Sequence, residues 1–143
     1  MEDNIKKETI RRLINQSKLA VLSTVTLENI SESAVVEISA RDNLELIFDT
    51  LPTFRKYKNL NNNQNVSVVI GWEPATIQYE GIATELTGDV LEEYKQIHFM
   101  KFPEAVKFEK LGIKFFKIIP RWIRYTDVSR QPWEIFEVEF PVS

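Results

Sequence analysis

Short runs of β-branched and apolar residues, separated by polar turns, make up most of this sequence. Such runs are typical of β-strands, and they do not alternate with helical segments as the strands of a parallel sheet do. The pattern favours a mainly β fold, an antiparallel barrel or sandwich of six or seven strands with short flanking helices. The predicted strand segments are 19–26, 33–40, 44–50, 66–70, 76–86, the pair 115–119 and 122–125, and 136–140.

Details of these segments predict how the sheet is shaped. The first three segments follow one another across short polar breaks, which predicts a three-strand meander. Within 76–86 the apolar positions change parity across Gly81, which predicts a β-bulge that bends the sheet towards closure. Pro120 interrupts the next apolar stretch, so we expect two short strands, 115–119 and 122–125, on either side of it.

Helical spacing of apolar residues predicts four short helical segments beside the strands. We expect Asn4 to cap the first, Thr53 to cap the second, and the Thr87-Gly88-Asp89 turn to begin the third. The predicted helical segments are 5–16, 53–60, 90–99 and 103–112.

Composition narrows the classes of function. A chain of 143 residues with 43% hydrophobic and 27% charged residues is typical of one globular domain, which we expect to span 1–143. The net charge of -3, from 18 Lys and Arg against 21 Asp and Glu, provides no basic field for nucleic acid. Cysteine is absent and His98 is the single histidine, so we expect no disulfide and no bound metal. No secretion signal or membrane span is predicted, which favours a cytoplasmic protein.

The segment from Phe48 to Leu60 carries the main candidate site. Arg55 and Lys56 lie together in the first turns of a predicted helix that follows a strand directly. A helix N-terminus offers free N–H groups and partial positive charge, so two cations there would complete a site for a terminal phosphate. The alternative is a basic helix face in contact with water.

This segment is part of a longer series of features along the sequence. A strand-end threonine, an Arg-Lys helix start, a leucine, an asparagine, an apolar strand and a tryptophan follow one another, and two later strands complete the series. The residues concerned are Thr50, Arg55, Lys56, Leu60, Asn63, 66–70, Trp72, 76–81 and 120–125. Over roughly residues 19–125, their joint spacing resembles the pyridoxamine 5'-phosphate oxidase-like FMN-binding split-barrel family.

The resemblance implies a homodimer of Greek-key split barrels that binds FMN at the interface between the two chains. It implies that Lys56 and Arg55 hold the flavin phosphate and that Thr50 lies near the flavin. Asp49 would either point away from the phosphate or orient Arg55. The implied cofactor-binding residues are Asp49, Thr50, Arg55, Lys56, Thr76, Gln78, Trp122 and Arg124.

Trp122 and Arg124 have alternatives that do not involve a ligand. In the family, residues of this late strand reach the flavin held mainly by the partner chain. A tryptophan at a strand end more often packs in a dimer interface than it covers a flavin, and Arg124 is equally explained by pairing with Glu134 or Glu137.

Departures from the family pattern argue against pyridoxamine phosphate oxidase activity itself. Phe54 stands where the oxidases have a phosphate-binding serine, and Thr76 where they have a glutamine that reaches the flavin ring. Gln64 replaces a proline, the strand 33–39 lacks a flanking arginine and lysine, and the C-terminus, 140–143, lacks the segment that grips the vitamin. We therefore expect a distant member of the family.

No residue has the setting of a general acid or base, and we expect His98 to be a surface or packing residue. The leading hypothesis is a flavin-dependent oxidoreductase of a small organic substrate, with FMN favoured over the deazaflavin F420. One alternative is a non-catalytic module of the same fold that stores a flavin or senses a ligand. The other is a dimeric structural protein whose site is emptied by Phe54 and Thr76.

Overall fold

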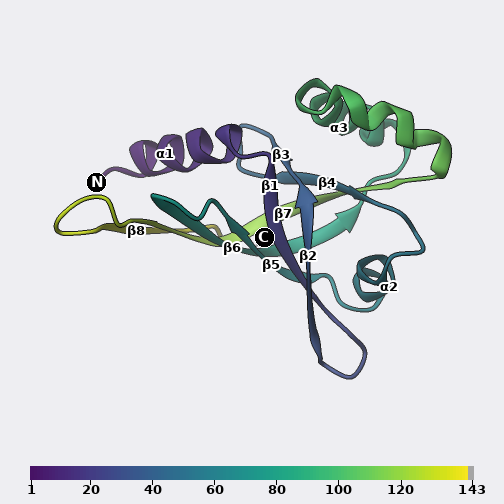
Figure 1. Ribbon diagram of the computed structural model, residues 1–143, viewed down its shortest axis with the longest axis horizontal. Helices are drawn as coiled ribbons and strands as arrows, with labels where there is room; N and C mark the ends of the chain where they lie inside the picture. Colours follow the sequence, from purple (N-terminus) through teal and green to yellow (C-terminus); the bar gives the residue numbers. More distant parts are fainter. Residues whose placement is uncertain (142–143) are drawn as a thin grey trace.

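A computed structural model describes residues 1–141 as a curled antiparallel sheet with helices on its flanks (Figure 1). The strands are β1 (Leu19–Val25), β2 (Ser31–Glu37), β3 (Ser39–Ala40), β4 (Leu46–Thr50), β5 (Asn65–Ile70), β6 (Ala75–Glu85), β7 (Lys114–Asp127) and β8 (Glu134–Glu139). The helices are α1 (Asp3–Gln16), α2 (Arg55–Asn62), α3 (Gly88–Lys101) and the 3₁₀ helix η1 (Pro103–Leu111).

The strand order is β2-β1-β5-β6-β7-β4-β3, and β8 pairs with β7 beside this path. Every pairing is antiparallel, and β7 is the central strand, since it pairs with β6, β4 and β8. The sheet curls so that β2, at one end of this order, approaches β4, the second strand from the other end. This architecture confirms the predicted mainly β, antiparallel split barrel with short flanking helices.

The predicted three-strand meander over residues 19–50 is wrong. The segment 33–40 is divided after Glu37 into β2 and β3. β2 pairs with β1, whereas β3 pairs with β4 at the other end of the strand order. Ile38 and Ser39 are both buried, which breaks the in-and-out alternation at the corner where the chain crosses between these two ends.

A bulge lies in the middle of the long pairing between β6 and β7. Glu80 pairs with Trp122 and Gly81 pairs with Pro120, so Arg121 is the extra residue. The bulge predicted at Gly81 is confirmed, and the extra residue lies on the partner strand. The predicted break at Pro120 is wrong, because β7 continues through the bulge, where a proline without an N–H is tolerated.

Gly81 is required at this bulge by the close approach of β7. A Cβ atom at Gly81 would lie 2.4 Å from the carbonyl oxygen of Ile119 and 2.9 Å from a methyl carbon of Ile118. We expect Gly81→Ala to lower the free energy of unfolding by about 1–3 kcal/mol, as measured by urea denaturation. Thr84→Ala, at a half-buried position of the same strand, is the control and should cost less. Equal stability of Gly81→Ala and the wild type would contradict this role.

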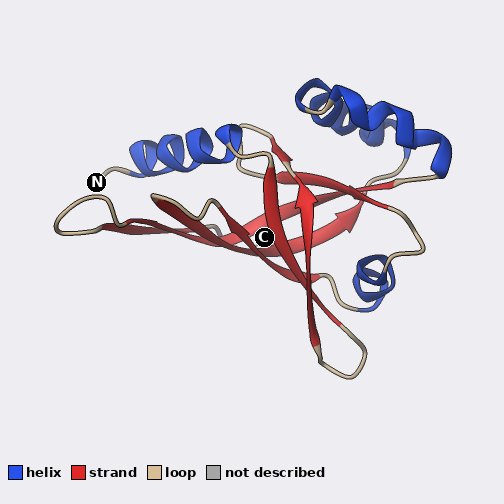
Figure 2. Cartoon of the chain, in the orientation of Figure 1, coloured by secondary structure: helices blue, strands red, loops and turns tan. Residues whose placement is uncertain are grey.

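The inner face of the sheet holds the main core, and α1 closes one end of it with Ile10 and Ile14. The hydroxyl oxygen of the buried Tyr79 lies within hydrogen-bond distance of the backbone carbonyls of Leu44 (2.9 Å) and Ile118 (3.0 Å), which share its single O–H donor. Figure 2 shows the helices outside the curled sheet. A second, smaller core lies beneath α3 and consists of Ile47, Leu86, Tyr94 and Phe115.

The helix starts differ from the predicted caps. α1 begins one residue before Asn4, which therefore lies inside the helix, and α2 begins two residues after Thr53. Thr87 directly precedes α3, but its side chain makes no capping hydrogen bond. Among residues 1–141, no helix combines the length and the apolar character that crossing a bilayer requires.

Candidate functional site

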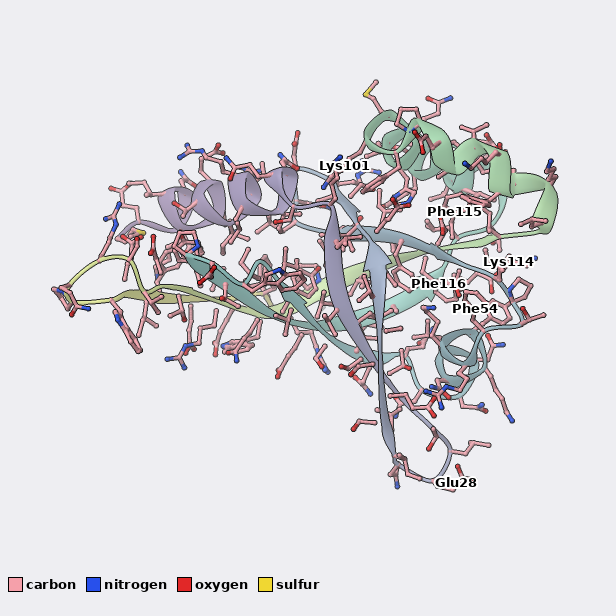
Figure 3. All side chains as sticks on the ribbon, in the orientation of Figure 1. Glu28, Phe54, Lys101, Lys114, Phe115 and Phe116 are labelled. Carbon is pink, nitrogen blue, oxygen red and sulfur yellow. The ribbon has the colours of Figure 1, made fainter. Side chains whose placement is uncertain are left out.

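A pocket of about 450 Å³ lies between the N-terminal end of α2 and the β1–β2 hairpin, and we call it the α2 pocket. β1 contributes Leu22 and Thr24, β2 contributes residues 32–35, and the start of α2 with its preceding loop contributes residues 53–56. Figure 3 shows Phe54 at this corner of the molecule, beside α2. The volume is within the range of small-molecule sites in proteins.

The two predicted phosphate ligands both line the α2 pocket. Arg55 is mostly exposed and forms an ion pair with Glu32, with 2.9 Å between Nη1 and Oε2. The ammonium group of Lys56 lies 4.9 Å from the ring centre of Phe54 and forms no ion pair with any residue in 1–141. Burial lowers the pKa of Lys56, and the negative charge of Asp49 partly opposes that shift. Lys56 is therefore a partly desolvated cation without a counter-ion in the described chain.

Glu32 is a pocket residue that the sequence reasoning missed. Its side chain is only 19% exposed, and its second oxygen accepts a hydrogen bond from the amide of Asn59 (2.8 Å). The same amide donates to the hydroxyl of Thr24 (2.9 Å), so the carboxylate is fixed in place. It is Glu32, and not Asp49, that orients Arg55. The sequence indicates Glu32 only through its position on β2, because it shares the inward-facing side of that strand with Ala34 and Val36. There it lies opposite the buried Thr24.

Asp49 and Thr50 end β4 and do not line the α2 pocket. Thr50 is buried, and its hydroxyl group donates to the carbonyl of Leu51 (3.2 Å). One carboxylate oxygen of Asp49 lies 3.4 Å from Nε2 of His98, so Asp49 points towards α3. Its charge still acts on Lys56, whose cationic form it favours.

His98 is enclosed between α3 and the sheet, where it packs against Phe102 and Phe115. Its Nδ1 lies 2.7 Å from the hydroxyl oxygen of Ser39, and its Nε2 has no hydrogen-bond partner within residues 1–141. Serine, histidine and aspartate are the residue types of a nucleophilic triad. However, Ser39 is 2% exposed and His98 is 0% exposed, so a substrate has no approach to either.

The four remaining predicted residues lie on the outer face of β6 and β7, away from the α2 pocket. Gln78 lies opposite Arg124, while the residues next to each of them in sequence point into the core. Glu137 of β8 accepts a hydrogen bond from Nε1 of Trp122 (2.9 Å) and pairs with Arg124 (3.6 Å). None of these residues lines the α2 pocket of the same chain. The four residues are Thr76, Gln78, Trp122 and Arg124.

Residues 7–127 match the sequence family described as pyridoxamine 5'-phosphate oxidase. The chain belongs to this family. The match covers more than four fifths of the sequence and includes both the α2 pocket and the outer-face residues. A comparison with curated proteins gave no match.

Solved structures share the fold of this pyridoxamine 5'-phosphate oxidase family member. General Stress Protein 26 from Bacillus anthracis is 25% identical, with a TM-score of 0.70 over 93% of this chain and 98% of that chain. The heme binding protein from Mycobacterium smegmatis is 15% identical, with a TM-score of 0.81 over 93% of this chain but 57% of that chain. HutZ, the heme storage protein from Vibrio cholerae, is 16% identical, with a TM-score of 0.64 over 80% of this chain and 89% of that chain.

Departures from the family pattern gather around the α2 pocket. Phe54 is 50% exposed beside the pocket and leaves it open, which counts against the hypothesis of an emptied site. The charged residue that β2 contributes to the pocket is Glu32. Among the described lining residues, the cations therefore come from α2 alone. The C-terminal segment 140–143 also departs from the family pattern, and two of its residues, Val142 and Ser143, lie outside the described residues.

Proposed function

We propose that this chain binds FMN in the α2 pocket and serves as an oxidoreductase for a small organic substrate. The observation that carries the proposal is the pair of cations, Arg55 and Lys56, in the first turn of α2 beside a pocket of about 450 Å³. A phosphate monoester at this place would meet two cations and the free N–H groups of the helix start. Bound FMN would supply the redox chemistry, while the chain supplies binding, orientation and exclusion of water.

The walls of the α2 pocket support a ligand that has one anionic end and one apolar end. The cations lie at one side, and Leu22, Ala34 and Val35 provide apolar surface on the β1–β2 hairpin. A flavin ring is a flat, largely apolar group that such surface can cover. Among the described residues, the titratable side chains that line the pocket are the paired Glu32 and the two cations, so we assign no catalytic acid or base.

Heme is the competing ligand, because two of the structurally similar proteins are described as heme binding or heme storage proteins. Heme iron is held by an axial ligand such as histidine, cysteine, methionine or tyrosine. None of the described residues that line the α2 pocket is of these types, and His98 is enclosed elsewhere. FMN needs no axial ligand and is therefore favoured.

We also propose that the protein is a homodimer formed through the outer face of the sheet. Val35, Val21 and Val69 lie side by side across β2, β1 and β5 on that face. Trp72, two residues after the end of β5, is 58% exposed. An exposed apolar surface of this kind favours association, and a second chain would bring Trp122 and Arg124 towards the flavin.

A charge placed in the middle of this valine row should prevent association. We expect Val69→Lys to weaken the dimer by about tenfold or more, because an unpaired ammonium would be desolvated in the interface. Sedimentation velocity at micromolar concentration measures the effect. Ser67→Ala, on the same face of β5, is the control and should remain dimeric. A wild-type protein that sediments as a monomer would contradict the proposed dimer.

An absorption spectrum tests the proposed ligand. Purified protein incubated with FMN and then freed of excess ligand should retain a flavin band, whereas the same treatment with hemin should leave no Soret band. Retention of hemin without flavin would contradict the proposal. Reduction of the bound flavin by NADH or NADPH, followed by turnover of a quinone or nitroaromatic compound, supports the oxidoreductase. Tight FMN binding without turnover supports the alternative of a flavin store or ligand sensor.

A further inference from the structure

A second cavity, of about 210 Å³, adjoins the α2 pocket, and we call it the hairpin pocket. Its walls come from the turn between β1 and β2 and from α2, which lie side by side in Figure 1. Glu32 and Arg55 line both cavities, so their ion pair lies at the boundary between them. The other described residues that line the hairpin pocket are Thr26, Leu27, Glu28, Lys58, Asn59 and Asn62.

Three cations of α2 follow the path from one cavity to the other. Lys56 lines the α2 pocket, Arg55 lines both cavities, and Lys58 lines the hairpin pocket. Arg55 and Lys58 are three residues apart on the helix and therefore lie on one face of it. Two phosphates joined in a row could each lie between two neighbouring cations of this series, whereas a single phosphate needs only the first two.

The boundary between the cavities can receive a ligand without the loss of a buried contact. The side chain of Arg55 is 77% exposed, and it reaches Glu32 through Nη1, so the other N–H groups of the guanidinium are available to a phosphate. Glu32 stays fixed by the amide of Asn59 whether or not Arg55 remains paired with it. Lys58 is exposed, and no carboxylate within residues 1–141 pairs with it.

The walls of the hairpin pocket combine apolar and polar groups. Leu27 is 67% exposed and provides apolar surface, while Thr26 and Asn62 provide a hydroxyl and an amide. The hydroxyl of Thr26 accepts from two backbone N–H groups of the turn (3.2 and 3.1 Å), which holds this wall in place. Glu28, which Figure 3 shows at the tip of the hairpin, and Glu32 are the carboxylates among the described lining residues, and the three cations outnumber them.

We propose that the two cavities together bind flavin adenine dinucleotide (FAD), which is FMN joined to AMP through a diphosphate. The inference rests on the proposed function, because the flavin half occupies the α2 pocket as FMN does. The phosphate on the flavin side lies between Lys56 and Arg55, and the second phosphate lies between Arg55 and Lys58. The adenosine enters the hairpin pocket, where Leu27 faces its base. FMN leaves Lys58 and the hairpin pocket unused.

Isothermal titrations with FAD and with FMN test this second subsite. The wild type should bind FAD about tenfold more tightly than FMN, because only the dinucleotide reaches Lys58. Lys58→Ala should lose about tenfold in FAD affinity and keep its FMN affinity within about twofold. Lys107→Ala removes the same charge from η1, outside both cavities, and should change neither affinity. Equal losses for the two flavins in Lys58→Ala would overturn the proposal.

A variant that fills the hairpin pocket tests where the adenosine lies. Asn62→Trp, at the exposed last position of α2, should abolish the preference for FAD and leave FMN binding unchanged. An undiminished preference for FAD in this variant would overturn the proposal. In the wild type, binding of FMN without binding of FAD would overturn the second subsite and leave the proposed function intact, whereas binding of neither flavin would overturn both.

Discussion

Replacing Lys56 with alanine is expected to weaken FMN binding by about 10- to 100-fold, which corresponds to about 1.4–2.7 kcal/mol. Lys56 is the pocket cation that has no carboxylate partner within residues 1–141, and it is partly desolvated already. A phosphate would therefore interact with the full positive charge of Lys56 without displacing another anion. Quenching of flavin fluorescence measures the dissociation constant. Riboflavin, which lacks the phosphate, should bind Lys56→Ala and the wild type equally well.

The pH dependence of binding gives Lys56 a further signature. Because burial lowers the pKa of Lys56, its positive charge is lost at a lower pH than that of an exposed lysine. FMN favours the charged form, so affinity should be full at neutral pH and should fall as the pH rises through the pKa of Lys56. Lys56→Arg, which stays charged, should keep its affinity over the same range. An identical alkaline loss in both proteins would exclude Lys56 as the group responsible.

Replacing Glu32 with glutamine is expected to tighten FMN binding by about five- to tenfold, or about 1.0–1.4 kcal/mol. The Glu32 carboxylate lies in the pocket and occupies Arg55, with 2.9 Å between the charged groups. A phosphate must either displace this carboxylate or bind next to it, and both cost free energy. Glutamine keeps an oxygen that can accept from Asn59 but carries no charge. Isothermal titration with FMN measures the gain.

A matched control separates this local effect from a change in overall charge. Glu37→Gln removes one negative charge from the same strand, outside the α2 pocket, and should leave FMN affinity almost unchanged. If Glu32→Gln weakens FMN binding, Glu32 is a direct ligand contact and does not compete with the phosphate.

The sequence predicted the strands well because each buries one face of alternating residues. β5 shows this most clearly, with Val66, Val68 and Ile70 buried and the residues between them exposed. What it did not show was how distant strands pair. The corner at Ile38 and the continuation of β7 through Pro120 are both set by the curvature of the whole sheet. The local pattern therefore predicts one strand over 33–40, and two strands on either side of Pro120, where the structure has the reverse.

The candidate site was predictable where neighbours in sequence form it. Arg55 and Lys56 line the α2 pocket because both lie in the first turn of α2. Glu32 was missed because its ion pair joins positions 23 residues apart, on two elements whose contact depends on the curl of the sheet. Trp122 and Arg124 face away from the pocket, and the local pattern indicates which face they share but not what covers it.

Parallel titrations of the wild-type protein with FMN and with riboflavin test the proposed phosphate site most directly. FMN is expected to quench with a dissociation constant in the micromolar range or below, and riboflavin to bind at least about 30-fold more weakly, because only FMN engages Arg55 and Lys56. Equal affinities for the two flavins, or no quenching by FMN, would contradict a phosphate site at the start of α2.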